Sequence, residues 1–481
     1  MDTATSAGTS RRTFLSAAIA AASAGAATPL VGTALTSPAH AEVKPPALPP
    51  PATAQSPDAE LGALLAKVDP ARIEATIEKL VSFGTRHTLS TQDDPVRGIG
   101  AARDWIFETM QGYGAASGGR LTVQKQSFVQ PVGPRIPTPT LITNVIATLQ
   151  GASEPNRAYV VTGHYDSRVT DVLNGTSDAP GADDDGSGVA VVMELVRILS
   201  AARQPEATIV FAAVAGEEQG LFGSDYMAKQ MKAAGVDVQG MISNDIVGSS
   251  TADDGTRYKH LVRLFSEGVP TTETAQQTSI RQSIGGENDG PSRQLARFIR
   301  EASDNGATGM DVRTIYRRDR YLRASDHVSF LQQGYPAVRF TEEAENFAHE
   351  HQDVRIENGV QFGDLIQFVD FAYMERVARV NACALWSLSQ GPGTPKGLAI
   401  IATVLTNSTT LNWTANTDPD LLGYEVVWRE STAPEWERAI PVGNVTAVTR
   451  DISKDNVQFG VRAVDQDGNR SPVAFPQVVT T

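Results

Sequence analysis

Cysteine is almost absent from this chain. Cys383 is the single cysteine among 481 residues, which excludes an intrachain disulfide and a zinc site built from several thiolates. Any bound metal must therefore be held by histidine, aspartate and glutamate. Without disulfides, the folded state has to be stabilised by its core or by such metals.

Cations are also scarce relative to anions. Lys and Arg number 41 against 55 Asp and Glu, and the formal net charge at pH 7 is −14. Nucleic acids and anionic membranes attract clustered basic residues, so this balance argues against both as partners. Solubility is the plainer explanation of the acidity. The content of 41% hydrophobic and 20% charged residues is globular, and the length allows a large core plus a second module.

The N-terminus has the pattern of an export signal. SRRTFL at residues 10–15 precedes an alanine-rich apolar run at 16–27 and a small-x-small AHA at 39–41. The run is too short to span a bilayer. The pattern resembles a twin-arginine signal, which a receptor reads and which is not an anchor; a basic tail is the alternative. We expect residues 1–41 to be the signal and the mature protein to be periplasmic or extracellular, with no membrane anchor.

After a Pro/Ala-rich linker at 42–58, residues 59–391 alternate between strand-like and helical segments. Such alternation indicates an α/β domain with a mixed, mostly parallel central sheet flanked by helices. In these sheets, ligands bind beyond the carboxyl ends of the strands. The clearest strand-like runs cover residues 141–149, 158–162, 208–215, 241–246 and 337–340, and helical stretches cover 188–202 and 223–234.

The pattern changes near Leu388. SLSQGPGTPKG is interpreted as a hinge, and residues 392–481 contain short alternating runs separated by turn signals. Such runs are typical of an antiparallel β-sandwich. Trp413, Tyr424 and the run at 459–464 resemble a fibronectin type III domain. Trp428 and Trp436 are candidates for a binding strip, with core or edge packing as the alternative.

Residues that bind metals or move protons follow the strand-like runs. In GHYDS, Asp166 stands two residues after His164, where a carboxylate can orient a metal-bound imidazole; a structural hydrogen bond is the alternative. In AGEEQG, Glu217 and Glu218 follow a very apolar run. One of them can bind metal while the other acts on the metal-bound water; a solvated acidic turn is the alternative.

Three more segments complete the inventory. Asp184 is the middle aspartate of ADDDG, three adjacent carboxylates that repel one another unless a cation screens them; an acidic helix N-terminus is the other reading. Asp245 ends an apolar run, where a carboxylate needs a cation or strong donors. His349 and His351 lie in a polar loop, so either is a ligand or an exposed histidine. Two imidazoles, three ligand carboxylates and a spare glutamate favour a two-metal hydrolytic site with its own base.

In this order, these motifs resemble the secreted di-zinc exopeptidases of the bacterial leucyl aminopeptidase and glutamate carboxypeptidase type. The resemblance covers about residues 58–390 and its motifs are specific. It implies the zinc exopeptidase fold and two zinc ions a few ångströms apart. It also implies a cis peptide bond between Asp184 and Asp185.

The resemblance assigns each residue a role. It implies one carboxylate that bridges both zinc ions, two further ligands for each zinc, a general base and a carboxylate behind the first histidine. In this assignment Asp184 is the bridge and Glu217 is the base. The resemblance further implies His164 and Asp245 at one zinc, Glu218 and His349 at the other, and Asp166 behind His164. His349 is preferred to His351 because it stands four residues before Asp353, the spacing usual in the family. Glu350-His351 departs from the family's usual Thr/Ser-Pro-like pair.

Residues 316–327 supply further candidates. Asp326 and His327 resemble the family's Ser-Asp-His stretch and are candidates for lining the pocket or orienting other groups; a structural role is equally compatible. Tyr316 or Tyr321 is a candidate donor to the developing oxyanion.

We therefore expect a secreted metallo-aminopeptidase that acts on peptides or proteins with two Zn²⁺, although Co²⁺ or Mn²⁺ also accept these ligands. A carboxypeptidase or dipeptidase on the same scaffold needs a cationic pocket, for which the candidates are Arg317, Arg318, Arg320 and Arg323. A single-zinc, glutaminyl-cyclase-like activity fits the full ligand set less well. In another class, a non-catalytic protein would bind cell-wall or polymer surfaces through its sandwich. The intact Glu217 argues against that reading.

Overall fold

The computed structural model describes residues 59–479, so the predicted signal at 1–41 and linker at 42–58 lie outside the described residues. A central mixed sheet contains eight strands: β1 (Leu121–Gln130), β2 (Thr140–Leu149), β3 (Glu154–His164), β4 (Ala207–Val214), β5 (Asp237–Asn244), β6 (Leu261–Ser266), β7 (Asp311–Ile315) and β8 (Ala337–Glu342). Their order is β1-β2-β4-β3-β5-β8-β6-β7.

The middle of the sheet is parallel, and its strands are covered on both faces. β4, β3, β5 and β8 pair in parallel, whereas β1, β2 and the β6/β8 pair are antiparallel. Every residue of β4 is buried, as expected for a strand between two layers of helices. On β4, Phe211 points into the larger core and its neighbour Val210 into a smaller one on the opposite face. The predicted fold class is confirmed.

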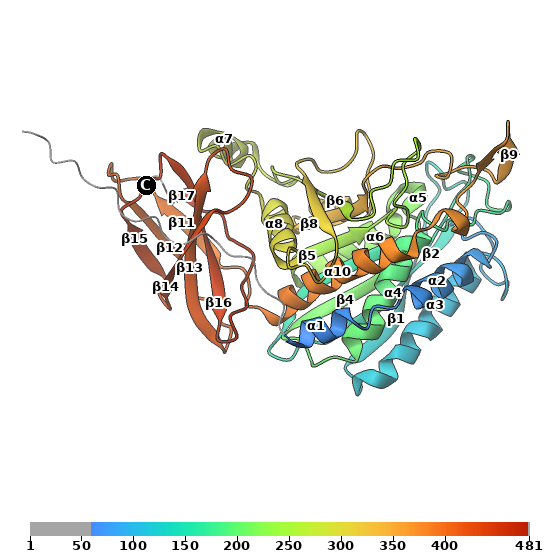
Figure 1. Ribbon diagram of the computed structural model, residues 1–481, viewed down its shortest axis with the longest axis horizontal. Helices are drawn as coiled ribbons and strands as arrows, with labels where there is room; N and C mark the ends of the chain where they lie inside the picture. The colour runs from blue at the N-terminus through green and yellow to red at the C-terminus, as the bar shows by residue number, and fades with distance from the viewer. Residues whose placement is uncertain (1–58, 480–481) are drawn as a thin grey trace, which may run out of the picture. The chain divides into compact units, whose positions relative to one another are not determined.

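Helices flank both faces of this sheet. α4 and α10 pack against one face (Figure 1), and α6 and α9 contribute to the smaller core on the other. The helices are α1 (Ala59–Leu65), α2 (Pro70–Val81), α3 (Ile99–Gly114), α4 (Gly186–Ser200), α5 (Glu217–Gly220), α6 (Phe222–Ala233), α7 (Ala275–Ser283), α8 (Pro291–Ser303), α9 (His327–Gln332) and α10 (Phe371–Gln390), with the 3-10 turns η1 (Ala115–Ser117) and η2 (Ile366–Phe368). A short hairpin, β9 (Arg355–Glu357) and β10 (Val360–Phe362), follows β8.

The C-terminal residues form two further sheets. One contains β11 (Lys396–Ile401), β12 (Thr409–Thr414), β15 (Ala447–Arg450) and β17 (Gln477–Val479), and the other contains β13 (Leu421–Glu430), β14 (Arg438–Gly443) and β16 (Val457–Asp465). Apolar side chains of both sheets share one core, which includes Trp413, Tyr424 and Phe459. The pairing is antiparallel except between β11 and β17. The fibronectin type III resemblance stays a prediction.

In this region one expectation is corrected, and one choice between two alternatives is decided in favour of packing. Residues 387–393 of the predicted hinge are buried and anchored: Arg157 donates to the carbonyls of Leu388 and Gly391, and Gly393 N–H donates to Asp418. Trp428 and Trp436 are also buried, so they form no exposed binding strip. Both tryptophans face packed neighbours, which the alternating pattern alone does not reveal.

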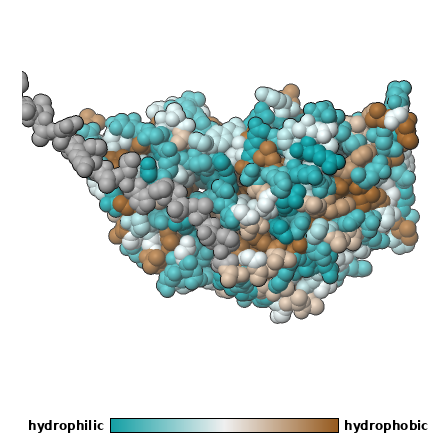
Figure 2. All heavy atoms as spheres, in the orientation of Figure 1, coloured by the Kyte–Doolittle hydropathy of each residue, from teal (hydrophilic) through white to brown (hydrophobic). Residues whose placement is uncertain are grey.

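The surface has a mixed character. On the face shown in Figure 2, hydrophilic residues predominate and are interspersed with hydrophobic ones. Among the helices of residues 59–479, none has the length and apolarity needed to cross a bilayer.

Candidate active site

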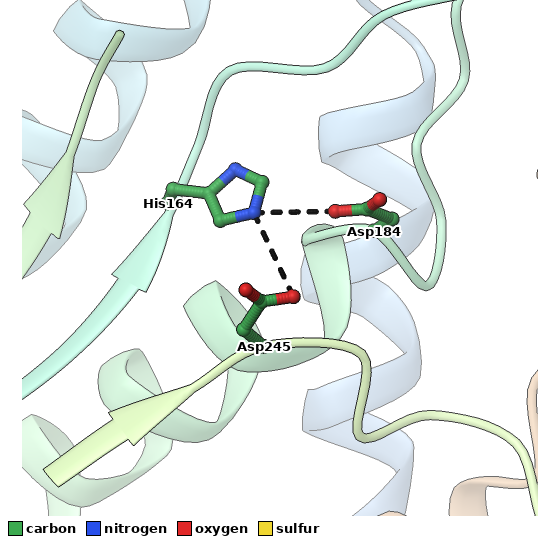
Figure 3. A group of neighbouring side chains, drawn as sticks. All are labelled: His164, Asp184 and Asp245. Carbon is green, nitrogen blue, oxygen red and sulfur yellow. Dashed lines mark ion pairs between the residues drawn. The ribbon is translucent and has the colours of Figure 1, made fainter. Parts of the chain in front are cut away.

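Three predicted metal ligands meet at the carboxyl ends of β3 and β5 (Figure 3). His164 is the last residue of β3, Asp245 directly follows β5, and Asp184 lies in the loop before α4. His164 Nε2 lies 3.2 Å from Asp184 Oδ1 and 3.9 Å from Asp245 Oδ1. All three side chains are buried, so their donor atoms converge on one enclosed position.

The second oxygen of Asp184 faces a different histidine. His351 Nε2 lies 2.7 Å from Asp184 Oδ2 and 3.1 Å from Glu218 Oε1. Burial opposes protonation, yet the carboxylates of Glu218 and Asp184 raise the pKa of His351 to about 11. This part of the site therefore strongly favours a positive charge.

His349 is not brought to this group. Its ring stacks on Phe368 with the ring centroids 3.5 Å apart, and burial lowers its pKa. The preference for His349 over His351 is thus corrected. His351 has a φ of 54°, in the left-handed region that non-glycine residues seldom adopt. Spacing to Asp353 carries no information about that backbone turn.

The three adjacent aspartates have separate partners. Asp183 accepts a hydrogen bond from Gly248 N–H, and Asp185 accepts from the N–H groups of His164 and Gly188, so that it caps α4. Only Asp184 is left facing both histidines. The Asp184–Asp185 peptide bond is cis, as the resemblance implies.

Asp364, which sequence reasoning missed, holds this loop from outside. Its two carboxylate oxygens accept from the backbone N–H groups of Asp183 and Asp184, at 2.8 and 2.7 Å. No sequence motif marks Asp364, because it lies just after β10 and is separated from Asp184 by 180 residues in the chain.

Asp166 lies behind His164, as predicted. The Nδ1 atom of His164 lies 3.1 Å from the Asp166 backbone oxygen and 3.7 Å from its carboxylate. The same carboxylate accepts from the N–H groups of Glu217 and Glu218. Although burial opposes it, His164 and these donors hold the pKa of Asp166 below its usual range. Asp166 thereby connects the end of β3 to the loop that carries both glutamates.

Glu217 begins α5 next to the ligand position of Glu218. Burial raises the pKa of Glu217 well above its usual range; His164 opposes this, and the charges of Asp245 and Glu218 add to it. A carboxyl group with a raised pKa beside a metal position is suited to taking up a proton.

Three arginines contact the site without being predicted. Arg339 is fully buried and lies 3.0 Å from Asp245 Oδ1, and Arg168 lies 2.8 Å from Glu218 Oε2. Arg86, also fully buried, donates to four backbone carbonyls, those of Leu80, Tyr165, Pro180 and Gly181. Apart from Leu80, which is six residues from Arg86, these partners lie far in sequence from the arginine that contacts them.

The proposed oxyanion donors lie elsewhere. The hydroxyl of Tyr316 donates to the carbonyl of Pro434 in the C-terminal sandwich. Tyr321 is 82% exposed and packs under Arg317. The structure therefore places neither tyrosine among the converging ligands.

Asp326 and His327 are buried next to the site. Burial raises the pKa of Asp326 to about 7, and the His164 charge opposes this while the Asp245 charge adds to it. His327 Nε2 lies 2.9 Å from the Arg318 carbonyl oxygen. Both are compatible with orienting roles.

Comparison with known proteins places this geometry in a family. The sequence pattern of peptidase family M28 matches residues 144–359, the span that carries all the converging ligands. A probable zinc metalloprotease of Leptosphaeria maculans is 54% identical over 88% of this chain and 97% of its own length. The chain belongs to peptidase family M28. A probable zinc metalloprotease of Pyricularia oryzae is likewise 54% identical over 88% of this chain and 86% of its own length.

Solved structures agree on the M28-type fold. The LapA aminopeptidase of Legionella pneumophila aligns with a TM-score of 0.50 at 16% identity, over 70% of this chain and 75% of its own. The glutaminyl cyclase of Macrostomum lignano aligns with a TM-score of 0.50 at 15% identity, over 69% of this chain and 94% of its own. At such low identity the likeness concerns the fold, which carries both activities. The chain is a zinc metallopeptidase of family M28 with an exopeptidase-like fold.

The side chains that converge in this site are of the types that bind zinc. Imidazole nitrogens and carboxylate oxygens are the ligands that Zn²⁺ accepts in catalytic sites, where three protein ligands leave a position for water. His164, Asp184 and Asp245 offer one such set, with their donor atoms all within 4.8 Å of one another. Asp184, Glu218 and His351 offer a second, and Glu350 is also within 4.8 Å of donor atoms of Asp184 and His351.

Proposed function

We propose that this protein is an aminopeptidase with a two-zinc site. The observation that carries the proposal is the position of Asp184: its two carboxylate oxygens face two different histidines, at 3.2 and 2.7 Å. A carboxylate held in this way is suited to bridge two metal ions. In this assignment, His164 and Asp245 complete one zinc site, and Glu218 and His351 complete the other, with His351 taking the role first expected of His349.

The chemistry follows from the neighbouring groups. Zinc in this site would supply Lewis acidity and lower the pKa of a bound water. Glu217 takes the proton of that water and returns it to the leaving amine of the scissile peptide. Asp166 keeps His164 and the backbone of Glu217 and Glu218 in place during this transfer.

The charge around the site favours a substrate amine over a substrate carboxylate. Beside Asp184 is a cavity lined by further carboxylates: Asp183, Glu342, Glu345, Glu350 and Asp364. Of the four arginines considered for a carboxylate pocket, Arg320 and Arg323 are engaged, since both pair with Glu345. This predominantly acidic lining supports an ammonium group over a carboxylate at this edge of the site. This supports cleavage at a free N-terminus.

The test uses matched peptides. An unmodified peptide, its N-acetylated form and its C-terminally amidated form are incubated with the purified protein and followed by mass spectrometry. We expect removal of N-terminal residues from the unmodified and amidated peptides only. Cleavage of the acetylated peptide from its C-terminus would establish a carboxypeptidase instead. A peptide that begins with glutamine and loses ammonia without hydrolysis would establish a cyclase.

Metal dependence is tested on the same reaction. Chelator treatment is expected to abolish turnover, and activity should return fully only after about two equivalents of zinc are added. Full recovery at one equivalent would contradict the two-zinc assignment.

Export is part of the proposal through the twin-arginine pattern at residues 10–15. Replacing Arg11 and Arg12 by lysine is expected to retain the protein in the cytoplasm, as measured by cell fractionation. Unchanged export of this variant would contradict the assignment.

A further inference from the structure

The ring nitrogen of His351 that faces away from Asp184, Nδ1, contacts a group that only donates hydrogen bonds. The Arg168 guanidinium lies 2.6 Å from His351 Nδ1. A guanidinium has five N–H donors and no acceptor, so Nδ1 accepts this hydrogen bond only in the neutral ring. The carboxylates beside Nε2 favour the protonated ring, whose Nδ1–H needs an acceptor instead. Nε2, on the opposite side of the ring, faces the carboxylates of Asp184 and Glu218.

Metal binding reverses what Nδ1 requires. A neutral imidazole carries one proton, and when Nε2 donates its lone pair to a metal the proton is on Nδ1. That N–H then needs an acceptor, usually a carboxylate or a carbonyl. Arg168 is unable to serve as one. His164 differs, because its Nδ1 already lies 3.1 Å from the carbonyl oxygen of Asp166.

Glu350 is placed to supply the missing acceptor. Its Oε1 lies 3.8 Å from His351 Nδ1. Its side chain is buried, and Oε2 has no hydrogen-bond partner among the residues that the structure describes. Arg323 pairs with Oε1 and keeps this carboxylate beside the ring.

We propose that Glu350 is a positioning residue for His351, accepting its Nδ1–H when Nε2 binds metal, while Arg168 leaves Nδ1 and stays paired with Glu218. This inference rests on the proposed two-zinc site and adds an asymmetry to it. The His164 side is arranged for metal beforehand, whereas the His351 side requires an exchange of partners. The zinc bound by His351 should therefore be the weaker of the two and the one sensitive to Glu350.

Zinc titration of the full-length chain tests the proposal. Metal-free protein is titrated with zinc in competition with a chromophoric chelator, so that both affinities are measured without an activity assay. Glu350→Ala is expected to weaken the second zinc about 10–100-fold and to leave the first unchanged, as is typical when a partner of a metal-bound histidine is lost. Glu350→Gln keeps an oxygen acceptor and should restore most of the affinity.

Two further variants make the test specific. Glu343→Ala removes a carboxylate of the same loop that pairs with Arg313 instead, and both zinc affinities should match the wild type. Arg168→Met removes the competing donor, so the second zinc should bind at least as tightly. Thermal unfolding of each variant checks that the chain is folded.

The outcomes separate this inference from the proposed function. If the wild type binds two zinc ions and Glu350→Ala binds both with unchanged affinity, the role of Glu350 is refuted while the two-zinc site stands. A loss of zinc in Arg168→Met as large as that in Glu350→Ala would also refute the exchange. If the wild type binds fewer than two zinc ions, the proposed function itself fails.

Discussion

At the scale of single residues, one side chain connects the two halves of the site. Asp184 faces His164 with one oxygen and His351 with the other, and Asp364 holds its backbone in that orientation. The positive φ of His351 turns its imidazole inward, while His349 stays stacked on Phe368. Two histidines only two positions apart thus have unrelated surroundings.

The two histidines provide a matched pair of variants. His351→Ala is expected to lose one of two zinc equivalents and to reduce turnover on the order of 10³-fold, because metal stabilisation amounts to several kcal/mol. His349→Ala should keep both zinc ions and most of the activity. Zinc content by elemental analysis and kcat/KM measure the difference. The reverse pattern would return the ligand role to His349.

Glu217 gives a second prediction at this scale. Glu217→Gln is expected to keep zinc and fold but to lower kcat about 10²–10⁴-fold, the usual contribution of a general base. Asp225→Asn in the next helix, whose partner Lys229 is exposed, serves as the control with near-normal turnover. Wild-type kcat in Glu217→Gln would remove Glu217 as the base.

At the scale of elements, two loops that carry ligands are fastened to one buried cation. Arg86 donates to the carbonyl of Tyr165, between His164 and Asp166, and to those of Pro180 and Gly181, just before the aspartates. Burial lowers the pKa of Arg86 to about 10, and the charge of Asp364 opposes this effect. The spacing between the β3 and α4 loops therefore depends on a residue that binds no metal.

Removal of the Arg86 guanidinium should affect both stability and metal binding. In Arg86→Met, several buried carbonyls lose their donor, at about 1–3 kcal/mol for each group left unsatisfied. We expect at least about 3 kcal/mol of destabilisation in urea unfolding, together with weaker zinc binding. Arg72→Met, at an exposed pair with Asp69, should stay within about 1 kcal/mol of the wild type. Equal stability of the two variants would contradict the role of Arg86 in holding the β3 and α4 loops together.

At the scale of the whole molecule, the sandwich and the peptidase residues share a buried ion-pair network. Asp289, just before α8, lies 2.8 Å from Arg297 on that helix and 2.6 Å from Arg429 on β13. Trp436 of the sandwich donates to Gln294 of α8. The described residues 59–479 all belong to one compact unit, which favours a single cooperative unfolding transition.

Calorimetry and one variant test this coupling. We expect a single transition for the wild type. Arg429→Met should cost about 3–5 kcal/mol, because it leaves Asp289 with an incompletely compensated buried charge. Lys396→Met breaks only an exposed pair with Asp237 and should change stability by at most about 1 kcal/mol. Two separate transitions would show that the sandwich unfolds independently.

The sequence alone was sufficient for the elements with strong local signals. β4 was predicted because its continuous apolar run is buried on both faces, and α4 because its apolar positions begin directly after Asp185. β1 was missed, since most of its residues are polar and it lies at the sheet edge, where Thr122, Gln124, Lys125 and Ser127 are exposed. β6 and β7 were not predicted either, and α8 was missed because it buries Arg293 and Arg297 in ion pairs and hydrogen bonds.

For the site, sequence determined which chemistry is available, and tertiary structure decided which residues share it. Residue types at the ends of apolar runs indicated His164, the pair Glu217-Glu218 and Asp245, because the carboxyl ends of parallel strands meet at one edge. The family resemblance then assigned Asp184 and Glu218 as ligands. The choice of His351, and the contacts of Arg86, Asp364 and Glu350, depended on backbone turns and on contacts between loops far apart in the chain. Those interactions arise only when the sheet brings the loops together, so no local pattern records them.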